Sequence, residues 1–181
     1  MKKLVLAFAL LVSAAATAPL LTGCNTEPSY VKQARKQEEE QKKTDDATIQ
    51  AYLTRNNITN YTRLESGIYL VPITDGPTSN PLITAGKKVT TKYVGKFIDP
   101  ITENQVFDAS SSNRTECGCY SFINGSSGNI AGWSQATLAM RLGDRKLIFI
   151  PSYLAYGTAG APGSIPANTP LLFDLEITNV E

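Results

Sequence analysis

Two segments of this 181-residue chain place apolar residues at every second position, and they constrain the fold more than any other feature. In KKVTTKYVGKF, Val89, Tyr93 and Phe97 fall on one side, while Lys92 and Lys96 fall on the other. In LLFDLEITNV, near the C-terminus, leucine, phenylalanine and isoleucine alternate with acidic residues and threonine. Successive side chains of a strand point to opposite faces of its sheet. Both segments are therefore predicted to be strands with one face in contact with water.

One helix and a third strand extend this pattern. The segment RKLIFIP at residues 145–151 is predicted to be a strand, and in GWSQATLAMRLGD the residues Trp133, Ala136 and Met140 recur at i, i+3 and i+7 before a glycine stop signal. Several antiparallel strands with one amphipathic helix indicate an α+β fold in which the sheet wraps over the helix. We expect this domain to span residues 86–181, an ordinary size for a single domain.

The region ahead of this domain divides by composition. Residues 45–85 begin with TDDATIQAYLTRNNI, in which Ile49, Tyr52 and Leu53 predict a short amphipathic helix, and a lead strand follows. Residues 24–44, which include KQARKQEEEQKK, are almost all polar and are predicted to be a solvated tether, helical or extended. A coiled-coil dimerisation arm is the alternative, but the apolar a and d positions are missing.

The first 23 residues have the composition of an export signal. Lys2 and Lys3 precede an apolar run that is short for a membrane span, and the run ends in LTGC at Cys24. This tetrapeptide resembles the bacterial lipobox, which implies that residues 1–23 are removed and that Cys24 is acylated. Several acyl chains on one residue make a stable membrane anchor. We therefore expect a lipid-anchored protein of the cell envelope. The absence of an aspartate directly after Cys24 favours the outer membrane, facing the periplasm. An ordinary secretory peptide with an incidental cysteine is the alternative.

The composition excludes several kinds of chemistry. The chain contains no histidine, so a Ser-His-Asp or Cys-His nucleophile and an imidazole zinc site are excluded. Loss of residues 1–23 removes two of the 17 basic residues and none of the 16 acidic ones, which leaves a net charge of about −1. Nucleic acid is therefore an unexpected partner, because its binding depends on neutralising phosphates.

Two further cysteines, Cys117 and Cys119, lie in ECGCYS and form an even pair once Cys24 is assigned to lipid. A local disulfide requires the chain to bend at Gly118, because the two Cα atoms must lie within about 7 Å. Two free thiols, or a redox or metal role, are the alternatives.

Six short motifs resemble those of the FKBP-type peptidyl-prolyl cis-trans isomerases, in order and at nearly the same spacing. They are YVGKF at Tyr93, VFDAS at Val106, IAGW at Ile130, AYG at Ala155, GSIP at Gly163 and FDLEI at Phe173. The resemblance covers essentially all of the predicted domain. It implies an antiparallel half-barrel wrapped around one short α-helix, with a proline-sized pocket between helix and sheet and a loop over the pocket.

The resemblance also implies roles for individual residues. Trp133 would form the pocket floor, Tyr156 would offer its hydroxyl to a substrate carbonyl, and the N–H of Ile130 would offer a second hydrogen bond. Asp108 would orient its neighbours, with Arg114 as a partner. The remaining residues expected to act in catalysis or to line the pocket are Phe107, Tyr93, Tyr120, Ala155, Ile165 and Phe173. Gly128, Asn129 and Ser164 depart from the family pattern and make the rim smaller and more polar.

The expected activity needs no cofactor, metal, nucleophile or general base. Rotation about an X–Pro bond is opposed by amide resonance, with a barrier of about 18–20 kcal/mol, and a dry apolar pocket favours the less charge-separated twisted amide. The expected substrates are proline-containing polypeptides of the cell envelope. Some chaperones of the family carry a domain inserted in the loop or a long N-terminal dimerisation helix, and the single short helix expected here favours a monomer. A module or chaperone that binds proline-containing segments in the same pocket without turnover is the alternative.

Overall fold

The structure is a computed structural model that describes residues 27–113 and 115–181. The predicted signal peptide at residues 1–23, the predicted lipidation site Cys24 and the residue Arg114 lie outside the described residues. Within the described part, no helix is long and apolar enough to cross a membrane.

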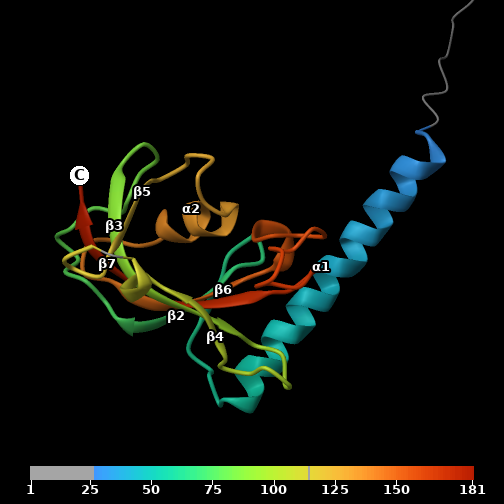
Figure 1. Cartoon of the computed structure of the whole chain (residues 1–181), viewed down its shortest axis with the longest axis horizontal. Coiled ribbons are helices and arrows are strands. Elements are labelled where there is room, and N and C mark those ends of the chain that lie inside the picture. Colours follow the sequence, from blue (N-terminus) through green and yellow to red (C-terminus); the bar gives the residue numbers. More distant parts are fainter. Residues whose placement is uncertain (1–26, 114) are drawn as a thin grey trace, which may run out of the picture.

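Seven strands form one antiparallel sheet (Figure 1). They are β1 (Thr62–Arg63), β2 (Tyr69–Thr74), β3 (Lys88–Phe97), β4 (Val106–Ala109), β5 (Tyr120–Ile123), β6 (Arg145–Ile150) and β7 (Leu171–Val180). Their order is β1-β2-β6-β7-β3-β4, and β5 also pairs with β3. The first half of β3 faces β5 and the second half faces β4. The predicted antiparallel sheet is therefore confirmed.

Two helices pack on opposite faces of this sheet, α1 (Ser29–Arg55) and α2 (Ala131–Thr137). The larger core cluster lies under α2 and includes Trp133, Phe173 and Leu175. The smaller one lies under α1 and includes Ile49 and Leu172. At the start of β7, Leu171 and Phe173 point to the larger cluster and Leu172 to the smaller one, because the strand has a period of two residues.

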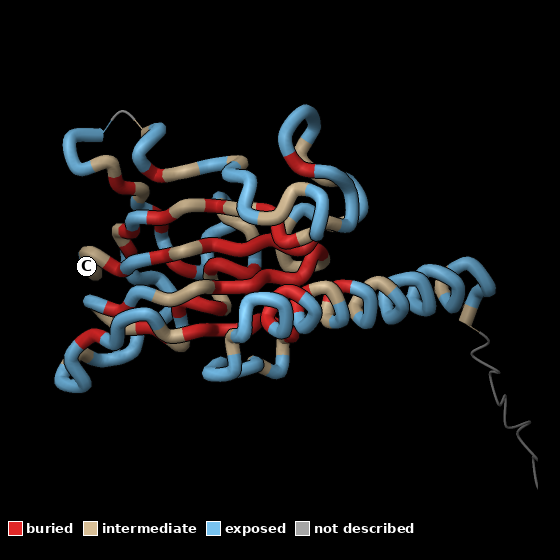
Figure 2. The backbone as a smooth tube through the Cα atoms, turned by 90° about the horizontal axis from the view of Figure 1, so that it is seen from below, coloured by how far each residue is buried: buried red, intermediate tan, exposed pale blue. Residues whose placement is uncertain are grey.

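The helix α1 corrects the predicted organisation of the N-terminal region. A polar tether at residues 24–44 and a short helix from Asp45 were expected, but one 27-residue helix runs from Ser29 to Arg55. Its outer turns lack an apolar stripe, yet they contain good helix formers and i,i+4 ion pairs such as Lys42–Glu38 at 2.8 Å. Those turns project from the sheet and are exposed (Figure 2).

The sheet and its core also extend ahead of residue 86, where the predicted domain begins. Strand β2 pairs with β6 in the interior of the sheet, and the last turns of α1 cover the smaller core cluster. Both segments precede residue 86, so the domain includes them. The pairing partner of β2 lies about 75 residues later in the chain, and for this reason local patterns do not reveal it.

The helix α2 is shorter than its sequence pattern suggests. It ends at Thr137, and the chain then turns so that the N–H of Ile83 binds the carbonyl of Met140 at 2.9 Å. Trp133, Ala136 and Met140 are all buried, as the pattern predicts. The apolar spacing therefore identified the buried side chains but not the end of the helix.

Candidate active site

A cavity of about 560 Å³ opens between α2, the inner face of the sheet and the loop that follows β6. Six aromatic side chains line it, together with side-chain amides, a hydroxyl and a carboxylate. The lining residues are Tyr93, Phe107, Asp108, Asn113, Tyr120, Ser127, Gly128, Asn129, Ile130, Ala131, Trp133, Ala155, Tyr156 and Phe173.

Trp133 is the centre of the aromatic walls. Its ring meets Tyr93 at a centroid distance of 4.8 Å and Phe173 at 5.2 Å, both nearly edge to face. Tyr120 approaches it in the same manner at 5.8 Å. Such T-shaped contacts place the positive edge of one ring against the negative face of another and hold the rings in fixed positions. The tryptophan is only 4% exposed, which makes it the floor of the cavity.

Two glycines allow these rings and α2 to approach the sheet. A Cβ on Gly95 of β3 would lie 2.6 Å from the ring of Phe107 and 3.1 Å from that of Phe173. A Cβ on Gly132 of α2 would lie 2.3 Å from Ile150 of β6. Glycine in a strand interior often marks such a close approach. At Gly95 a methyl group would displace a cavity wall, and at Gly132 it would push α2 away from β6.

Two hydrogen bonds orient the tyrosines of the cavity. The Tyr93 hydroxyl donates to the Asp108 carboxylate at 2.6 Å, and the Tyr120 hydroxyl donates to the amide oxygen of Asn129 at 2.6 Å. Asp108 also accepts the N–H of Ala109 at 2.8 Å. Burial, followed by the hydrogen bond to Asp108, raises the pKa of Tyr93 well above its ordinary value. Tyr93 is therefore neutral at physiological pH.

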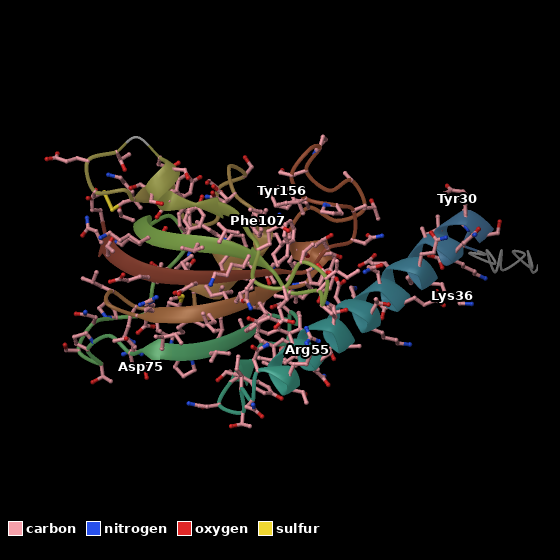
Figure 3. All side chains as sticks on the ribbon, turned by 60° about the horizontal axis from the view of Figure 1, so that its bottom comes forward. Tyr30, Lys36, Arg55, Asp75, Phe107 and Tyr156 are labelled. Carbon is pink, nitrogen blue, oxygen red and sulfur yellow. A yellow bond between two sulfur atoms is a disulfide. The ribbon has the colours of Figure 1, made fainter. Side chains whose placement is uncertain are left out.

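Tyr156 stands at the mouth of the cavity in the loop after η2 (Ser152–Leu154). Its side chain is 40% exposed, and partial burial, together with the nearby Asp108, raises its pKa. Its hydroxyl forms no hydrogen bond within residues 27–113 and 115–181, and the same holds for the N–H of Ile130. Figure 3 shows Tyr156 and Phe107 close together on one side of the sheet. The cavity mouth thus offers two hydrogen-bond donors to a ligand.

Nine of the ten residues predicted to act in catalysis or to line the pocket do line this cavity. Ile165 does not. Its side chain is 6% exposed and packs in the larger core cluster, because a turn closed by the Ala161–Ile165 bridge folds it inward. The position of a side chain inside a loop of small residues has no periodic signal in the sequence.

Three polar lining residues were not predicted as site residues: Asn113, Ser127 and Asn129. The sequence shows Asn129 only as a departure from the family pattern, whereas the structure gives it a specific contact with Tyr120. The small and polar residues at 127–129, directly before the apolar IAGW motif, are the signal that could have identified these lining residues.

The two remaining cysteines form a disulfide between Cys117 and Cys119, with their Cα atoms 5.2 Å apart. Gly118 between them has a φ of +59°, which provides the bend that the sequence required. Of the alternatives for this pair, the structure has the disulfide. No group of three or more acidic or cysteine side chains in the described ranges could hold a metal ion.

The fold and the cavity define a class of protein in which an antiparallel sheet and a short helix enclose an aromatic pocket. The sequence matches the FKBP-type peptidyl-prolyl cis-trans isomerase family over residues 80–178. The chain therefore belongs to this family, which is a family of enzymes.

Relatives and a solved structure agree with this assignment. The chain is 38% identical over 116 residues to the peptidyl-prolyl cis-trans isomerase Fkbp12 of Drosophila melanogaster, covering 64% of this chain and 99% of that protein. It is 39% identical over 116 residues to FK506-binding protein 4 of Dictyostelium discoideum, of which it spans only 29%, and the match covers 64% of this chain. A peptidyl-prolyl cis-trans isomerase structure from Pseudomonas syringae matches 79% of this chain and 95% of that one, with a TM-score of 0.62 and 26% identity.

Proposed function

We propose that this chain accelerates cis-trans isomerisation of X–Pro bonds in the cavity around Trp133. The observation that supports the proposal is a cavity with an aromatic floor, walled by Tyr93 and Phe173, which Tyr156 and Ile130 also line. A prolyl ring is compact and apolar, so it can replace water above the indole. The Tyr156 hydroxyl and the Ile130 N–H can donate hydrogen bonds to carbonyl groups of the same peptide.

The cavity acts on the amide by its polarity and its shape. The planar amide is stabilised by charge separation between oxygen and nitrogen, and this stabilisation is lost when the C–N bond twists. Transfer from water to an apolar pocket therefore penalises the planar form more than the twisted one. Each 1.4 kcal/mol or so of this preference gives about a tenfold increase in rate.

Hydrogen bonds at the mouth hold the peptide while the prolyl bond turns. Tyr156 lies in the loop after β6 and Ile130 lies directly before α2. The two residues are far apart in the sequence, yet both line one cavity. Asp108 supports catalysis from the wall, where it fixes the ring of Tyr93 against Trp133. The chain needs no proton transfer for this reaction.

The test is the relaxation rate of a short X–Pro peptide in the presence of the full chain. We expect wild-type protein to accelerate it, Trp133→Ala to lose most of the acceleration, and Tyr156→Phe to lose about 2- to 10-fold, the worth of one hydrogen bond. Tyr61→Phe is the matched control, because Tyr61 is 42% exposed and packs on Tyr69 away from the cavity. A folded wild-type chain that binds proline peptides without acceleration would instead indicate a binding module.

We also propose a lipid-anchored protein of the cell envelope, with Cys24 as the acylated residue and proline-containing polypeptides outside the cytoplasm as substrates. The LTGC sequence supports the anchor. The projecting part of α1 supports it as well. Residues 29–44 precede the part of the helix that packs on the sheet, span about 24 Å and can hold a monomeric domain away from an outer-membrane surface.

Expression of the full chain in a bacterium tests this location. Mass spectrometry of the mature amino terminus should find an acylated Cys24, and the protein should sediment with membranes. Cys24→Ser should release it in soluble form. Recovery of an unacylated chain in the soluble fraction for both proteins would contradict the anchor and leave the isomerase proposal unchanged.

A further inference from the structure

Asp45 is a buried carboxylate that joins α1 to the loop bearing Tyr156. It is 1% exposed and accepts hydrogen bonds from the N–H of Ser152 at 2.8 Å and from the Ser152 hydroxyl at 2.7 Å. Gln41, one turn earlier in α1, donates a third bond at 2.8 Å. Burying a carboxylate is unfavourable unless several donors satisfy it. The arrangement is therefore a built contact between segments 107 residues apart.

Ser152 transmits this contact to both neighbours of Tyr156. Its N–H and hydroxyl bind Asp45, while its carbonyl oxygen accepts the N–H of Ala155 at 2.9 Å and the N–H of Gly157 at 2.8 Å. Tyr156 lies between these two residues. The position of its side chain at the cavity mouth thus depends on where Ser152 is held.

Tyr153, the residue after Ser152, is also held on the side away from the cavity. The hydroxyl of Tyr153 donates to the carbonyl of Ser66 at 2.6 Å, and Lys42 of α1 lies 5.4 Å from the centre of its ring. Gly67 leaves room for this contact, since a Cβ there would lie 2.4 Å from the Tyr153 hydroxyl. The rear of the turn is held by α1 and by the β1–β2 connection, while Ala155 and Tyr156 face the cavity.

We propose that Asp45 is a positioning residue for the active site, which acts through Ser152 to hold Ala155 and Tyr156 at the mouth of the cavity. This inference rests on the proposed isomerase function and extends it to α1. The helix then has a second role besides covering the sheet, because it sets the position of a substrate-binding loop. Loss of the contact between Asp45 and Ser152 should therefore weaken substrate binding more than it slows isomerisation of the bound peptide.

The experiment compares Asp45→Asn and Asp45→Ala with Asp46→Asn in the full chain. Asp46 is a matched control at the next position, since its carboxylate binds Tyr69 at 2.7 Å and Arg63 at 3.0 Å, away from the loop. The measurements are kcat and KM for a proline peptide, amide hydrogen exchange at residues 152–160, and the global unfolding midpoint. Ser152→Ala, alone and combined with Asp45→Asn, tests the shared pathway.

For Asp45→Ala we expect KM to rise about tenfold, within the roughly 10²-fold that a 1 Å misplacement can produce, with a smaller fall in kcat. Exchange should accelerate at the amides of Ala155 and Gly157 but not in β3 or β7. Asp45→Asn should show the same changes to a smaller extent, and its effect should not add to that of Ser152→Ala. Asp46→Asn should leave KM and local exchange within twofold of wild type.

Equal effects of the Asp45 and Asp46 variants on KM and on loop exchange would overturn the proposal and leave Asp45 as a structural contact only. If the wild-type chain itself shows no isomerase activity, the proposed function fails separately. Loop exchange and the quenching of Trp133, the sole tryptophan, by a proline peptide then decide whether Asp45 positions the binding loop. Unchanged exchange and binding in the Asp45 variants would refute it in that case too.

Discussion

The hydroxyl of Tyr93 donates a 2.6 Å hydrogen bond to the carboxylate of Asp108. Tyr93 comes from the centre of β3 and Asp108 from β4, the neighbouring strand. The same tyrosine ring stands edge to face on Trp133 at 4.8 Å. An exposed carboxylate at the edge of the sheet therefore fixes a buried ring that in turn orients the cavity floor.

Removal of the Tyr93 hydroxyl tests how much the hydrogen bond to Asp108 contributes beyond the packing of the ring. We expect Tyr93→Phe to reduce the free energy of unfolding by about 0.5–1.5 kcal/mol and kcat/KM by up to about tenfold, because the ring remains but its hydrogen bond is lost. Tyr52→Phe loses a comparable bond to Asn104 at 2.9 Å on the other face of the sheet. It should reduce stability without changing kcat/KM, as urea unfolding and the peptide assay will show. Equal activity losses in the two variants would contradict this account.

The pH dependence follows from two of the cavity tyrosines, Tyr93 and Tyr156. Burial raises the pKa of Tyr93 and of Tyr156, so both stay protonated up to at least the ordinary tyrosine pKa of about 10. With no histidine in the chain, kcat/KM should be constant from about pH 6 to pH 9.

The contribution of these two tyrosines to stability should change only at alkaline pH. A raised folded-state pKa means that the folded protein binds more protons than the unfolded chain above about pH 10, so stability is complete below that pH and falls as the pH rises. Urea unfolding from about pH 8 to pH 11 measures this fall, and Tyr93→Phe should make it smaller. A bell-shaped rate profile near neutrality would instead indicate a proton-transfer step.

How far sequence reasoning succeeded depends on the range of the underlying interaction. The alternation in β3 correctly placed Val89 and Tyr93 in the core, because strand periodicity is a property of adjacent residues. The collinear motifs identified nine cavity residues for a different reason, since they carry the resemblance to a family of known architecture. Ile165 was misplaced because its direction depends on how a loop closes.

The helix α1 shows what sequence patterns could not predict. Its outer turns have no apolar face, so hydrophobic periodicity could not detect the helix before Asp45. The contact from Asp45 to Ser152 crosses 107 positions and connects a helix to a loop, and neither segment contains a pattern that points to the other. Long-range polar contacts of this kind become visible only in the folded structure.

The two close-packed glycines provide a direct test of the cavity geometry. We expect Gly95→Ala to destabilise the protein by about 1–3 kcal/mol and to reduce activity, because the added methyl group must displace Phe107 or Phe173. Gly132→Ala should behave similarly through Ile150. Gly128→Ala is the stability control, since its nearest neighbour would be 3.8 Å away. Thermal unfolding with the peptide assay measures both effects, and tolerance of alanine at Gly95 would refute the close packing.

Reduction of the Cys117–Cys119 disulfide should have a small effect on stability. The bond closes a loop with a single residue between the cysteines, so it restricts the unfolded chain very little and should contribute less than about 2 kcal/mol. Denaturant unfolding with and without a reductant measures this contribution, and the Cys117→Ala/Cys119→Ala variant should not respond to the reductant. A loss several times larger would show that the disulfide maintains the adjoining β5 and its cavity residue Tyr120.

The two halves of α1 should respond differently to truncation of a side chain. Ile49 is fully buried against the sheet, whereas Tyr30 is 72% exposed on the projecting turns and stands clear of the domain in Figure 3. Ile49→Ala should reduce the free energy of unfolding by about 2–5 kcal/mol, because it removes apolar contacts and leaves a cavity. Tyr30→Ala should change it by less than about 0.5 kcal/mol. Chemical denaturation of both variants in the full chain measures the difference, and equal small losses would mean that α1 lies outside the cooperative core.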